Sequence, residues 1–442
     1  MLIKRLKSMD RNLKVLLLVM EPWRKDDSGG NTLDNFFNGM NGVEFAQVYC
    51  GNAMPENDVC KKYFQIPESE MFRSFFNRKK VGHAFDINAV RKDPVTPHTN
   101  NSKQSTLIKS IKRIRPESLI SLKLLLCRYS NWKTPELRQF IVDFNPDVIY
   151  APCYASPFQL ALTRFVKQLT GKRIITWSAD DNYSLRHFNL SPFFWLNRFW
   201  NRHCLRKTYP CYDEFFSISE DEIKEMSPIV GKQMKILRKG VVVPETFFPR
   251  EVHHPIKFIY AGGLYLNRHK SLVAIADALR DLNKDIVRAE LHIYTGTSLS
   301  DKVSHQLNDG RSVFNHGLVS SSELSSIYQD CDVAIHCESF DLKYRLGTRL
   351  SFSTKVIDCF QSGCAILAIA WEEHTALKYL QKEDAAFCVT SVKDIEPMVR
   401  RIIENPSLIP KYARKAYECE CKNHRIEDVQ KTLYDSFVRC SK

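Results

Sequence analysis

The chain has 442 residues, 44% of them hydrophobic and 26% charged, which is an ordinary balance for a globular protein. This length predicts two domains, and the composition excludes a chain too polar to form a core. Lys and Arg number 64 against 50 Asp and Glu, a formal net charge of +14. The excess suits nucleic acid, an anionic membrane surface, a phosphate-bearing substrate, or solubility alone.

Fourteen cysteines are scattered along the chain. Only Cys419 and Cys421 lie close together, and their Cys-x-Cys spacing differs from the Cys-x-x-Cys of zinc and redox sites. The pattern indicates reduced thiols in a cytoplasmic protein.

Near the N-terminus, a basic segment precedes the apolar run Val15–Met20. The run is far shorter than the roughly 20 residues needed to span a bilayer. Glu21 and Pro22 follow it directly, where a signal peptide would have a small-residue cleavage site. We therefore expect a buried strand here and no membrane span in the chain.

Short apolar runs alternate with helical patterns through the first half of the chain. Strands are predicted at Lys14–Met20, Glu44–Tyr49, Val148–Tyr150, Ile174–Trp177 and Phe215–Ile218. Helices are predicted at Leu33–Met40, Phe158–Leu169 and Phe194–Tyr209. This alternation predicts an α/β fold, with a parallel sheet covered by helices on both faces.

The same alternation continues in the second half. Strands are predicted at Lys257–Tyr260, Glu290–Tyr294, Val333–His336 and Ala365–Ala368. Helices are predicted at Ser271–Asp281, Ser322–Asp330 and Ser353–Ser362. In parallel sheets of this kind ligands bind at the carboxyl ends of the strands, so the site is sought there.

Composition suggests where the chain divides. The proline-rich stretch Pro244–Pro255 separates the halves, and Asp93–Thr106 reads as a loop. We expect an N-terminal domain at residues 1–247 with an insertion at about 51–135, and a C-terminal domain at 248–424. Residues 425–442 form a closing helix, because Ile426, Val429, Leu433 and Phe437 share one helical face.

A glycine turn follows the predicted strand Lys257–Tyr260. Gly262 and Gly263 allow close approach of the backbone to a ligand, and Arg268 and Lys270 follow before a helix begins. A helix N-terminus with two cations suits a diphosphate. The turn lacks the Gly-Lys-Ser/Thr ending of a phosphate-binding P-loop. The alternative is a simple turn with solvated basic residues.

A second candidate element opens the predicted helix Ser353–Ser362. Ser353 and Thr354 can cap this helix, whose free N–H groups then suit a phosphate. Asp358 lies one turn after Thr354 and could accept hydrogen bonds from ribose hydroxyls. The alternative is a capped helix with an exposed carboxylate.

Together these two elements resemble the GT-B glycosyltransferases, in particular the bacterial group-1 (family 4-like) enzymes that build polysaccharides and glycoconjugates. The resemblance covers the C-terminal half well and the N-terminal half more loosely. It implies two Rossmann-like doubly wound domains facing across a cleft. It also implies transfer of a sugar from a nucleotide-sugar donor to a glycan or lipid-linked acceptor, with retention, and without a metal or other cofactor.

The resemblance also implies roles for single residues. Arg268 and Lys270 would clamp the donor diphosphate beside Gly262 and Gly263, and Asp358 would bind the ribose. The other donor-binding residues implied are Thr354 and Lys355 at the phosphates and Leu318 and Val319 at the nucleobase.

One departure from the family pattern concerns its Glu-x7-Glu pair. The position eight before Asp358 is Leu350, so the first glutamate is missing there. Glu338, which follows the predicted strand Val333–His336, becomes the candidate catalytic glutamate that touches the donor sugar. The assignment implies an insertion at roughly Asp341–Leu350.

The first half carries two further candidate elements. The turn containing Gly29, Gly30 and Asn31 follows the first strand, where relatives line the acceptor side of the cleft. Asp180 and Asp181 follow the strand Ile174–Trp177, where relatives often carry a His-Asp pair. Two adjacent carboxylates could bind acceptor hydroxyls or stabilise positive charge at the anomeric carbon. A plain glycine turn and a capping role are the respective alternatives.

Two basic stretches with bulky apolar residues suggest contact with an anionic membrane surface, although ordinary packed helices are the alternative. The basic residues are Lys109, Lys112, Arg113, Arg115, Lys123 and Arg128 in the first stretch and Arg198, Arg202, Arg206 and Lys207 in the second. No nucleic-acid-binding motif accompanies the charge, so nucleic acid is not expected as a partner. The alternative functions are a nucleotide-sugar epimerase on the same scaffold, a basic nucleic-acid-binding protein suggested by the charge alone, and an inactive scaffold.

Overall fold

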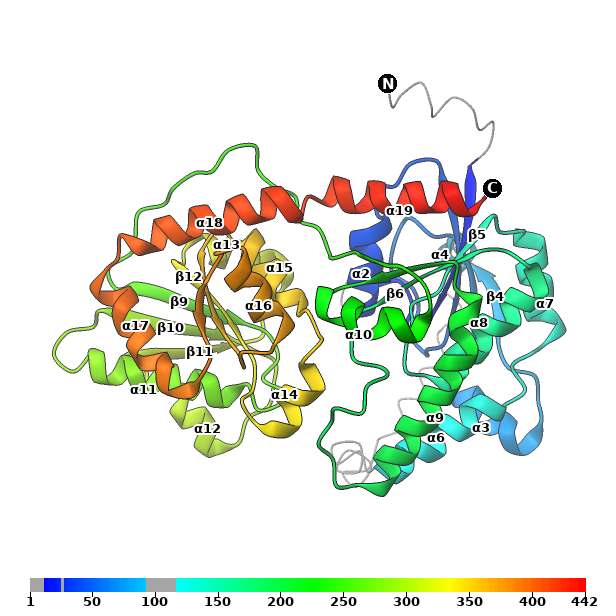
Figure 1. Cartoon of the computed structure of the whole chain (residues 1–442), viewed down its shortest axis with the longest axis horizontal. Coiled ribbons are helices and arrows are strands. Elements are labelled where there is room, and N and C mark those ends of the chain that lie inside the picture. The colour runs from blue at the N-terminus through cyan, green and yellow to red at the C-terminus, as the bar shows by residue number, and fades with distance from the viewer. Residues whose placement is uncertain (1–11, 25–27, 93–116) are drawn as a thin grey trace.

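The computed structural model describes residues 12–24, 28–92 and 117–442. Two mostly parallel sheets flanked by helices lie side by side, one built from each half of the chain (Figure 1). The α/β architecture expected from the alternating pattern is confirmed.

The first sheet has eight strands in the order β4-β3-β2-β1-β5-β6-β7-β8, and only β4 runs antiparallel to its neighbour. Its strands are β1 (Leu13–Val19), β2 (Val43–Tyr49), β3 (Lys62–Gln65), β4 (His83–Asp86), β5 (Val148–Tyr150), β6 (Ile174–Ser178), β7 (Glu214–Ser217) and β8 (Met234–Ile236). Strand β1 is almost entirely apolar because helices cover both faces of the central strands.

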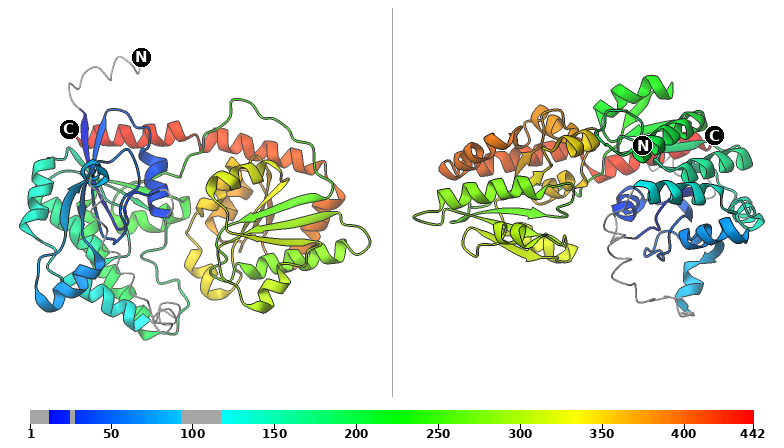
Figure 2. Two further views of the ribbon diagram at one scale, coloured as in Figure 1. Left: turned by 180° about the vertical axis from the view of Figure 1, so that it is seen from behind. Right: turned by 90° about the horizontal axis from the view of Figure 1, so that it is seen from below.

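The helices of the first half pack on this sheet or on one another (Figure 2). They are α2 (Ser28–Phe37), α3 (Glu68–Asn77), α4 (Ile87–Lys92), α6 (Glu117–Tyr129), α7 (Pro135–Phe144), α8 (Pro157–Thr170), α9 (Pro192–Thr208) and α10 (Glu220–Val230). Prolines open α7, α8 and α9, where a missing N–H leaves no helical bond unmade.

The second sheet has six parallel strands in the order β11-β10-β9-β12-β13-β14. Its strands are β9 (Ile256–Ala261), β10 (Ala289–Tyr294), β11 (Val313–Gly317), β12 (Val333–Cys337), β13 (Ala365–Ile369) and β14 (Phe387–Val389). Its helices are α11 (His269–Leu282), α12 (Asp301–Gln306), α13 (Ser321–Gln329), α14 (Leu342–Thr348), α15 (Thr354–Gln361), α16 (Thr375–Lys382), α17 (Ile395–Glu404) and α18 (Leu408–Asn423). This strand order is the doubly wound order of Rossmann-like folds.

Every strand predicted from the sequence is present, with bounds shifted by at most one residue. Within the stretch expected as an insertion at about 51–135, β3 and β4 extend the first sheet. The loop expected at Asp93–Thr106 lies outside the described residues, as do the basic residues Lys109, Lys112, Arg113 and Arg115.

The last helix, α19 (Ile426–Cys440), returns to the first half (Figure 1). It packs against α2, β1 and β6, and the fully buried Phe437 ring lies 5.9 Å from that of Phe37. Val241 forms a β-bridge with Arg425, so the outgoing and returning segments run side by side. The helix predicted here thus completes the core of the first half.

Within the described part of the chain, no helix combines the length and the apolar character needed to cross a bilayer.

Candidate functional site

The order in which strands are added to the second sheet reverses between β9 and β12. From β9 the chain proceeds outward to β10 and β11, whereas from β12 it proceeds to β13 and β14 on the other side. Doubly wound sheets bind ligands at the carboxyl ends of the strands at such a switch point. Gly262 directly follows β9 and Glu338 directly follows β12, so both predicted residues lie at this point.

Gly262 is in close contact with Lys355, which belongs to the first turn of α15. Its φ is +138°, and a Cβ at this position would lie 1.8 Å from the Lys355 Nζ. The ammonium donates a hydrogen bond to the Tyr260 hydroxyl at 2.8 Å and lies 4.3 Å from the ring centroid. The Tyr260 hydroxyl in turn donates to the carbonyl oxygen of Gly263 at 2.8 Å. A glycine is therefore required where the lysine crosses the turn.

Helix α15 begins as the sequence predicts. The Ser353 hydroxyl is the N-cap and accepts from the backbone N–H of Lys355, and Thr354 is the first helical residue. Burial, together with the nearby Arg268 charge, lowers the pKa of Lys355 to about 8. The site thus holds an ammonium whose charge is costly without a bound anion.

Arg268 and Glu338 form a buried ion pair. Nε and one terminal nitrogen of Arg268 donate to the two Glu338 oxygens at 2.9 and 2.7 Å, and the Glu338 side chain is only 3% exposed. Burial opposes the charge on both groups, but their mutual attraction prevails. The pKa of Glu338 is therefore below its ordinary value and that of Arg268 above it. The predicted clamp residue holds the predicted catalytic carboxylate in place.

Two buried histidines that sequence reasoning missed lie beside this pair. His336 lies in the fully buried strand β12 and His374 directly precedes α16, with ring centroids 6.1 Å apart. Among the described residues, neither ring has a hydrogen-bond partner at either nitrogen. Burial lowers the pKa of His336 to about 3 and also lowers that of His374, so both rings are neutral at pH 7. A polar residue inside an otherwise apolar strand was the available signal.

Lys270 is placed apart from this cluster. Its ammonium pairs with Asp341 at 2.8 Å and is more than half exposed. Asn267 also donates to Asp341, at 2.6 Å, so the three residues form a surface group on the outer side of the turn.

Asp358 connects the second half to the first. The side chain is open to solvent, but protein surrounds its carboxyl group closely enough to raise its pKa, an effect that Lys239 and Lys355 oppose. Lys239, which follows β8, is buried and donates to the Asn31 side-chain oxygen at 2.5 Å. The structure therefore brings Asn31 and Asp358 to the same lysine. Lys239 was not among the residues singled out from the sequence.

The other residues of the predicted Gly29–Asn31 turn open α2. A Cβ on Gly30 would lie 1.9 Å from the carbonyl oxygen of Arg24, so glycine permits a close contact between two backbone segments. Gly29 precedes it in the first turn of the helix.

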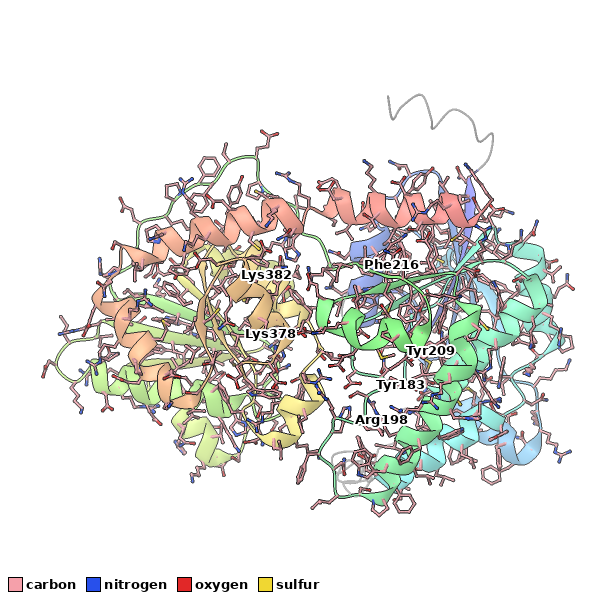
Figure 3. The ribbon with its side chains drawn as sticks, in the orientation of Figure 1. Tyr183, Arg198, Tyr209, Phe216, Lys378 and Lys382 are labelled. Carbon is pink, nitrogen blue, oxygen red and sulfur yellow. The ribbon has the colours of Figure 1, made fainter. Side chains whose placement is uncertain are left out.

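Asp181 is enclosed by protein. Its carboxylate accepts from Arg198 and from the backbone N–H of Ser184, each at 2.7 Å. Burial works against ionisation, but hydrogen bonds from His187 and Ser184 and the Arg198 charge hold the pKa of Asp181 well below its usual range. Figure 3 shows Arg198 on α9 near Tyr183 and Tyr209. These contacts favour the structural alternative for Asp181.

Asp180, by contrast, is exposed and lies at the junction between the halves. It accepts from the Ser351 hydroxyl at 2.6 Å, three residues before α15 begins. Nearby, Arg349 donates to Glu225 of α10 at 2.8 Å. Lys378 of α16, labelled in Figure 3, pairs with Asp221 of α10 at 2.6 Å. The junction is thus polar and tied by ion pairs.

Leu318 and Val319 follow β11 at the edge of the second sheet. Leu318 is 80% exposed, and the preceding His316 ring stacks on Tyr294 at 4.7 Å. Strand β10 separates β11 from β9, so this loop lies beside the switch point without contacting Lys355 in the described contacts.

The site therefore gathers three cations, Arg268, Lys355 and Lys239, around the carboxylates Glu338 and Asp358. Such an arrangement can bind a phosphate group and accept hydrogen bonds from sugar hydroxyls. Among the described residues, no group of three or more His, Cys, Asp or Glu side chains is arranged to hold a metal ion.

No family model and no curated protein matches the sequence, but solved structures match the fold. HepE from Anabaena in complex with UDP aligns with a TM-score of 0.61 at 10% identity, over 97% of this chain and 100% of HepE. The α,α-trehalose 6-phosphate synthase of Burkholderia multivorans aligns with a TM-score of 0.56 at 10% identity, over 97% of this chain and 96% of that enzyme.

TarM aligns with a TM-score of 0.50 at 12% identity, and the alignment covers 71% of this chain but only 58% of TarM. At such low identities the likeness concerns the fold. Two doubly wound sheets in series, matched over their whole length by solved glycosyltransferases, give this chain the GT-B fold that its sequence predicts.

Proposed function

We propose that this protein is a glycosyltransferase that moves a sugar from a nucleotide-sugar donor, bound by its second half, to a glycan or lipid-linked acceptor on its first half. The observation that carries the proposal is the meeting of Lys355, Gly262 and the buried Arg268–Glu338 pair at the switch point of the second sheet. Asp358 lies about one helical turn after Lys355 on α15.

In this proposal Lys355 and the N-terminus of α15 bind the diphosphate, and Asp358 binds the ribose. Glu338 faces the donor sugar, where a fixed carboxylate stabilises the positive charge that develops at the anomeric carbon. Arg268 acts through Glu338 as a positioning residue, and Lys270 adds long-range positive charge from the surface.

The similar structures supply independent support for a uridine nucleotide. HepE has been crystallised with UDP and also with UDP and glucose. Retention of the anomeric configuration and a place in polysaccharide or glycoconjugate synthesis rest on the sequence resemblance alone. Contact with an anionic membrane is proposed from the basic stretches of the sequence, and the exposed α9 side chains Phe193, Leu196 and Phe199 offer an apolar surface for it.

Calorimetry with UDP, GDP, dTDP and CMP tests the proposal, followed by assay of the matching sugar nucleotide. A glycosyltransferase releases nucleotide only when an acceptor is added. An epimerase would alter the sugar nucleotide alone, and an inactive scaffold would bind none of the four nucleotides. Either of these last results would overturn the proposal.

Nucleotide binding is expected to depend on pH through Lys355. Because the pKa of the free lysine is lowered to about 8, it loses its charge as pH rises above that value, and UDP affinity should fall between pH 8 and 9.5. Lys355→Met should bind UDP at least about tenfold more weakly at pH 7 and lose this pH dependence. In the unfolded chain this lysine has its higher ordinary pKa and keeps its proton above pH 8, whereas the folded protein loses it. Deprotonation of Lys355 therefore makes the wild type more stable as pH rises through 8. Calorimetry from pH 6.5 to 9.5 measures the binding effect. An unchanged slope in the variant would contradict the assignment.

Asp358→Asn is expected to weaken UDP binding more than binding of 2′-deoxy-UDP, because only the ribonucleotide offers the 2′-hydroxyl to the carboxylate. A charged acceptor contributes about 1.5–3 kcal/mol, so the loss for UDP should be about tenfold or more. Affinities of both nucleotides for wild type and variant give the comparison. Equal losses for the two would leave Asp358 with a role in the helix only.

A further inference from the structure

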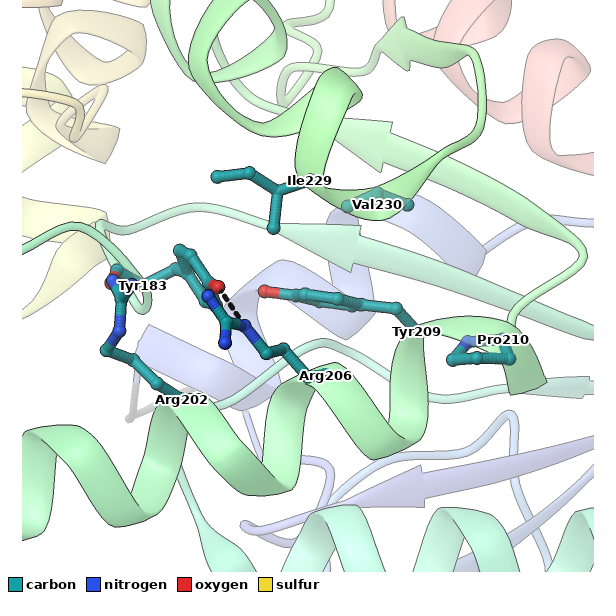
Figure 4. Close-up of a pocket in the computed structure, with 7 residues that line it drawn as sticks. All are labelled: Tyr183, Arg202, Arg206, Tyr209, Pro210, Ile229 and Val230. Carbon is teal, nitrogen blue, oxygen red and sulfur yellow. Dashed lines mark hydrogen bonds between the residues drawn. The ribbon is translucent and has the colours of Figure 1, made fainter.

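A cavity of about 510 Å³ lies in the first half, between α9 and the C-terminal end of α10 (Figure 4). Arg202 and Arg206 line one side of the cavity. The Tyr183 ring, from the loop that follows β6, lies beside them. This cavity belongs to the first sheet, whereas the candidate donor site lies at the second. None of the residues assigned to nucleotide binding lines it.

The arginines come from a helix without a single acidic residue. Helix α9 presents Arg198, Arg202 and Arg206 at four-residue intervals, which places like charges one turn apart. Arg198 is neutralised by Asp181 at 2.7 Å. Within the described residues, Arg202 and Arg206 have no carboxylate within the 4.0 Å of an ion pair. No carboxylate of the described residues therefore relieves their mutual repulsion, and a bound anion would relieve it.

Both guanidinium groups are held in place by neutral contacts. Arg202 donates to the carbonyl oxygen of Tyr183, and its guanidinium carbon lies 4.0 Å from the centroid of the Tyr183 ring. Arg206 donates through Nε to the Tyr183 hydroxyl at 2.5 Å, the dashed line in Figure 4. Each contact uses one of five N–H groups, so most donors of both side chains remain free for a ligand. The pair is preorganised for bidentate binding.

The opposite wall of the cavity is apolar. Ile229, 42% exposed, and Val230 come from the end of α10, and the buried Tyr209 ring lies between them and the arginines. On α9, the exposed Phe199 lies one turn before Arg202 on the same helical face. A ligand here would meet two positive charges on one side and an apolar surface on the other.

The cavity also adjoins the junction between the halves. Tyr183 and Tyr209 line a second, much smaller cavity whose walls include Asp181, Glu222 and Leu350. Leu350 belongs to the segment that leads into α15 of the second half. Tyr183 and Tyr209 thus form a wall common to both cavities.

We propose that this cavity binds a phosphate ester with an apolar arm, its phosphate on Arg202 and Arg206 and its arm against Ile229 and Tyr209. A phosphate monoester carries a charge of about −1.5 to −2 at pH 7, which matches two unpaired guanidinium groups better than a single carboxylate does. The identification of this ester as part of the sugar acceptor rests on the proposed function; its binding does not.

The test is calorimetry with hexyl phosphate, inorganic phosphate and hexanol. Wild-type protein should bind hexyl phosphate more tightly than either of the others. Arg202→Gln with Arg206→Gln should weaken hexyl phosphate at least about thirtyfold, because two charge-assisted contacts are lost. Lys207→Gln is the matched control, since Lys207 is exposed on the same helix and does not line the cavity. It should change the affinity less than twofold.

Several results would overturn the proposal. Equal affinity for inorganic phosphate would show that the apolar arm contributes nothing to binding. Equal affinity for hexanol would show that the phosphate contributes nothing. An equal loss in Lys207→Gln would mean a general charge effect. If the double variant does not fold, Ile229→Glu serves instead, because a carboxylate opposite the arginines should repel the phosphate to a similar extent. UDP affinity should be unchanged in these variants. A wild type that binds hexyl phosphate but no nucleotide would refute the proposed function and leave this site standing.

Discussion

Arg268→Ala is expected to lower the free energy of unfolding by about 3–5 kcal/mol, because it leaves the Glu338 carboxylate buried without its partner. Glu338 is only 3% exposed, its neighbours His336 and His374 are neutral, and the Lys355 ammonium is a further charge that acts on it without an ion pair between them. Burial would then favour the protonated acid, so the loss should shrink as the pH falls toward 5. Urea unfolding at pH 5 and pH 8 measures both effects.

The partner variant separates loss of the pair from loss of the arginine. Arg268→Ala combined with Glu338→Gln removes the buried charge and should recover much of the stability, while transfer activity should stay low if Glu338 acts at the donor sugar as proposed. Arg400→Ala removes an arginine from an exposed helical pair with Glu396 and should leave stability nearly unchanged. A double variant no more stable than Arg268→Ala would show that the pair is not the source of the effect.

Phe437→Ala is expected to destabilise the first half by about 3–5 kcal/mol, the usual loss for a fully buried phenylalanine. The ring is wholly buried and packs against Phe37 of α2, from the opposite end of the chain. Val438→Ala, on the next position of the same helix and only half-buried, is the control and should cost clearly less. Thermal unfolding followed by tryptophan fluorescence measures the effect, since Trp23 and Trp177 pack in the same core. Equal effects of the two changes would mean that α19 is only loosely attached.

The apolar runs were sufficient to predict the central strands, since a strand buried on both faces needs an unbroken set of core residues. Strands at or near the sheet edges were missed for the opposite reason. Strand β3, second from the edge of its sheet, is four residues long and begins with an exposed lysine, and the edge strand β11 includes Asn315 and the exposed His316. Strands this short contain too few buried residues to form a periodic pattern.

Part of the geometry of the candidate site could be predicted from the sequence. The cap at Ser353 and the glycine turn are local features, so their sequence neighbours define them. The pairing of Arg268 with Glu338 joins residues 70 positions apart, and Asp181 is neutralised from the next helix. Neither partner could be read from spacing, because the fold alone brings them together. Lys239 could not be identified from the sequence for the same reason, because it interacts with Asn31 of the first half and Asp358 of the second.

The return of α19 to the first sheet affects how this protein is made. During synthesis the first half leaves the ribosome long before residues 426–440 are made. Until then, Phe37 and its neighbours in that core lack the helix that covers them in the folded protein. The second half folds in the meantime as an insertion between two parts of one core. We therefore expect the nascent first half to depend on chaperones until translation reaches α19, and its final locking to be a post-translational event.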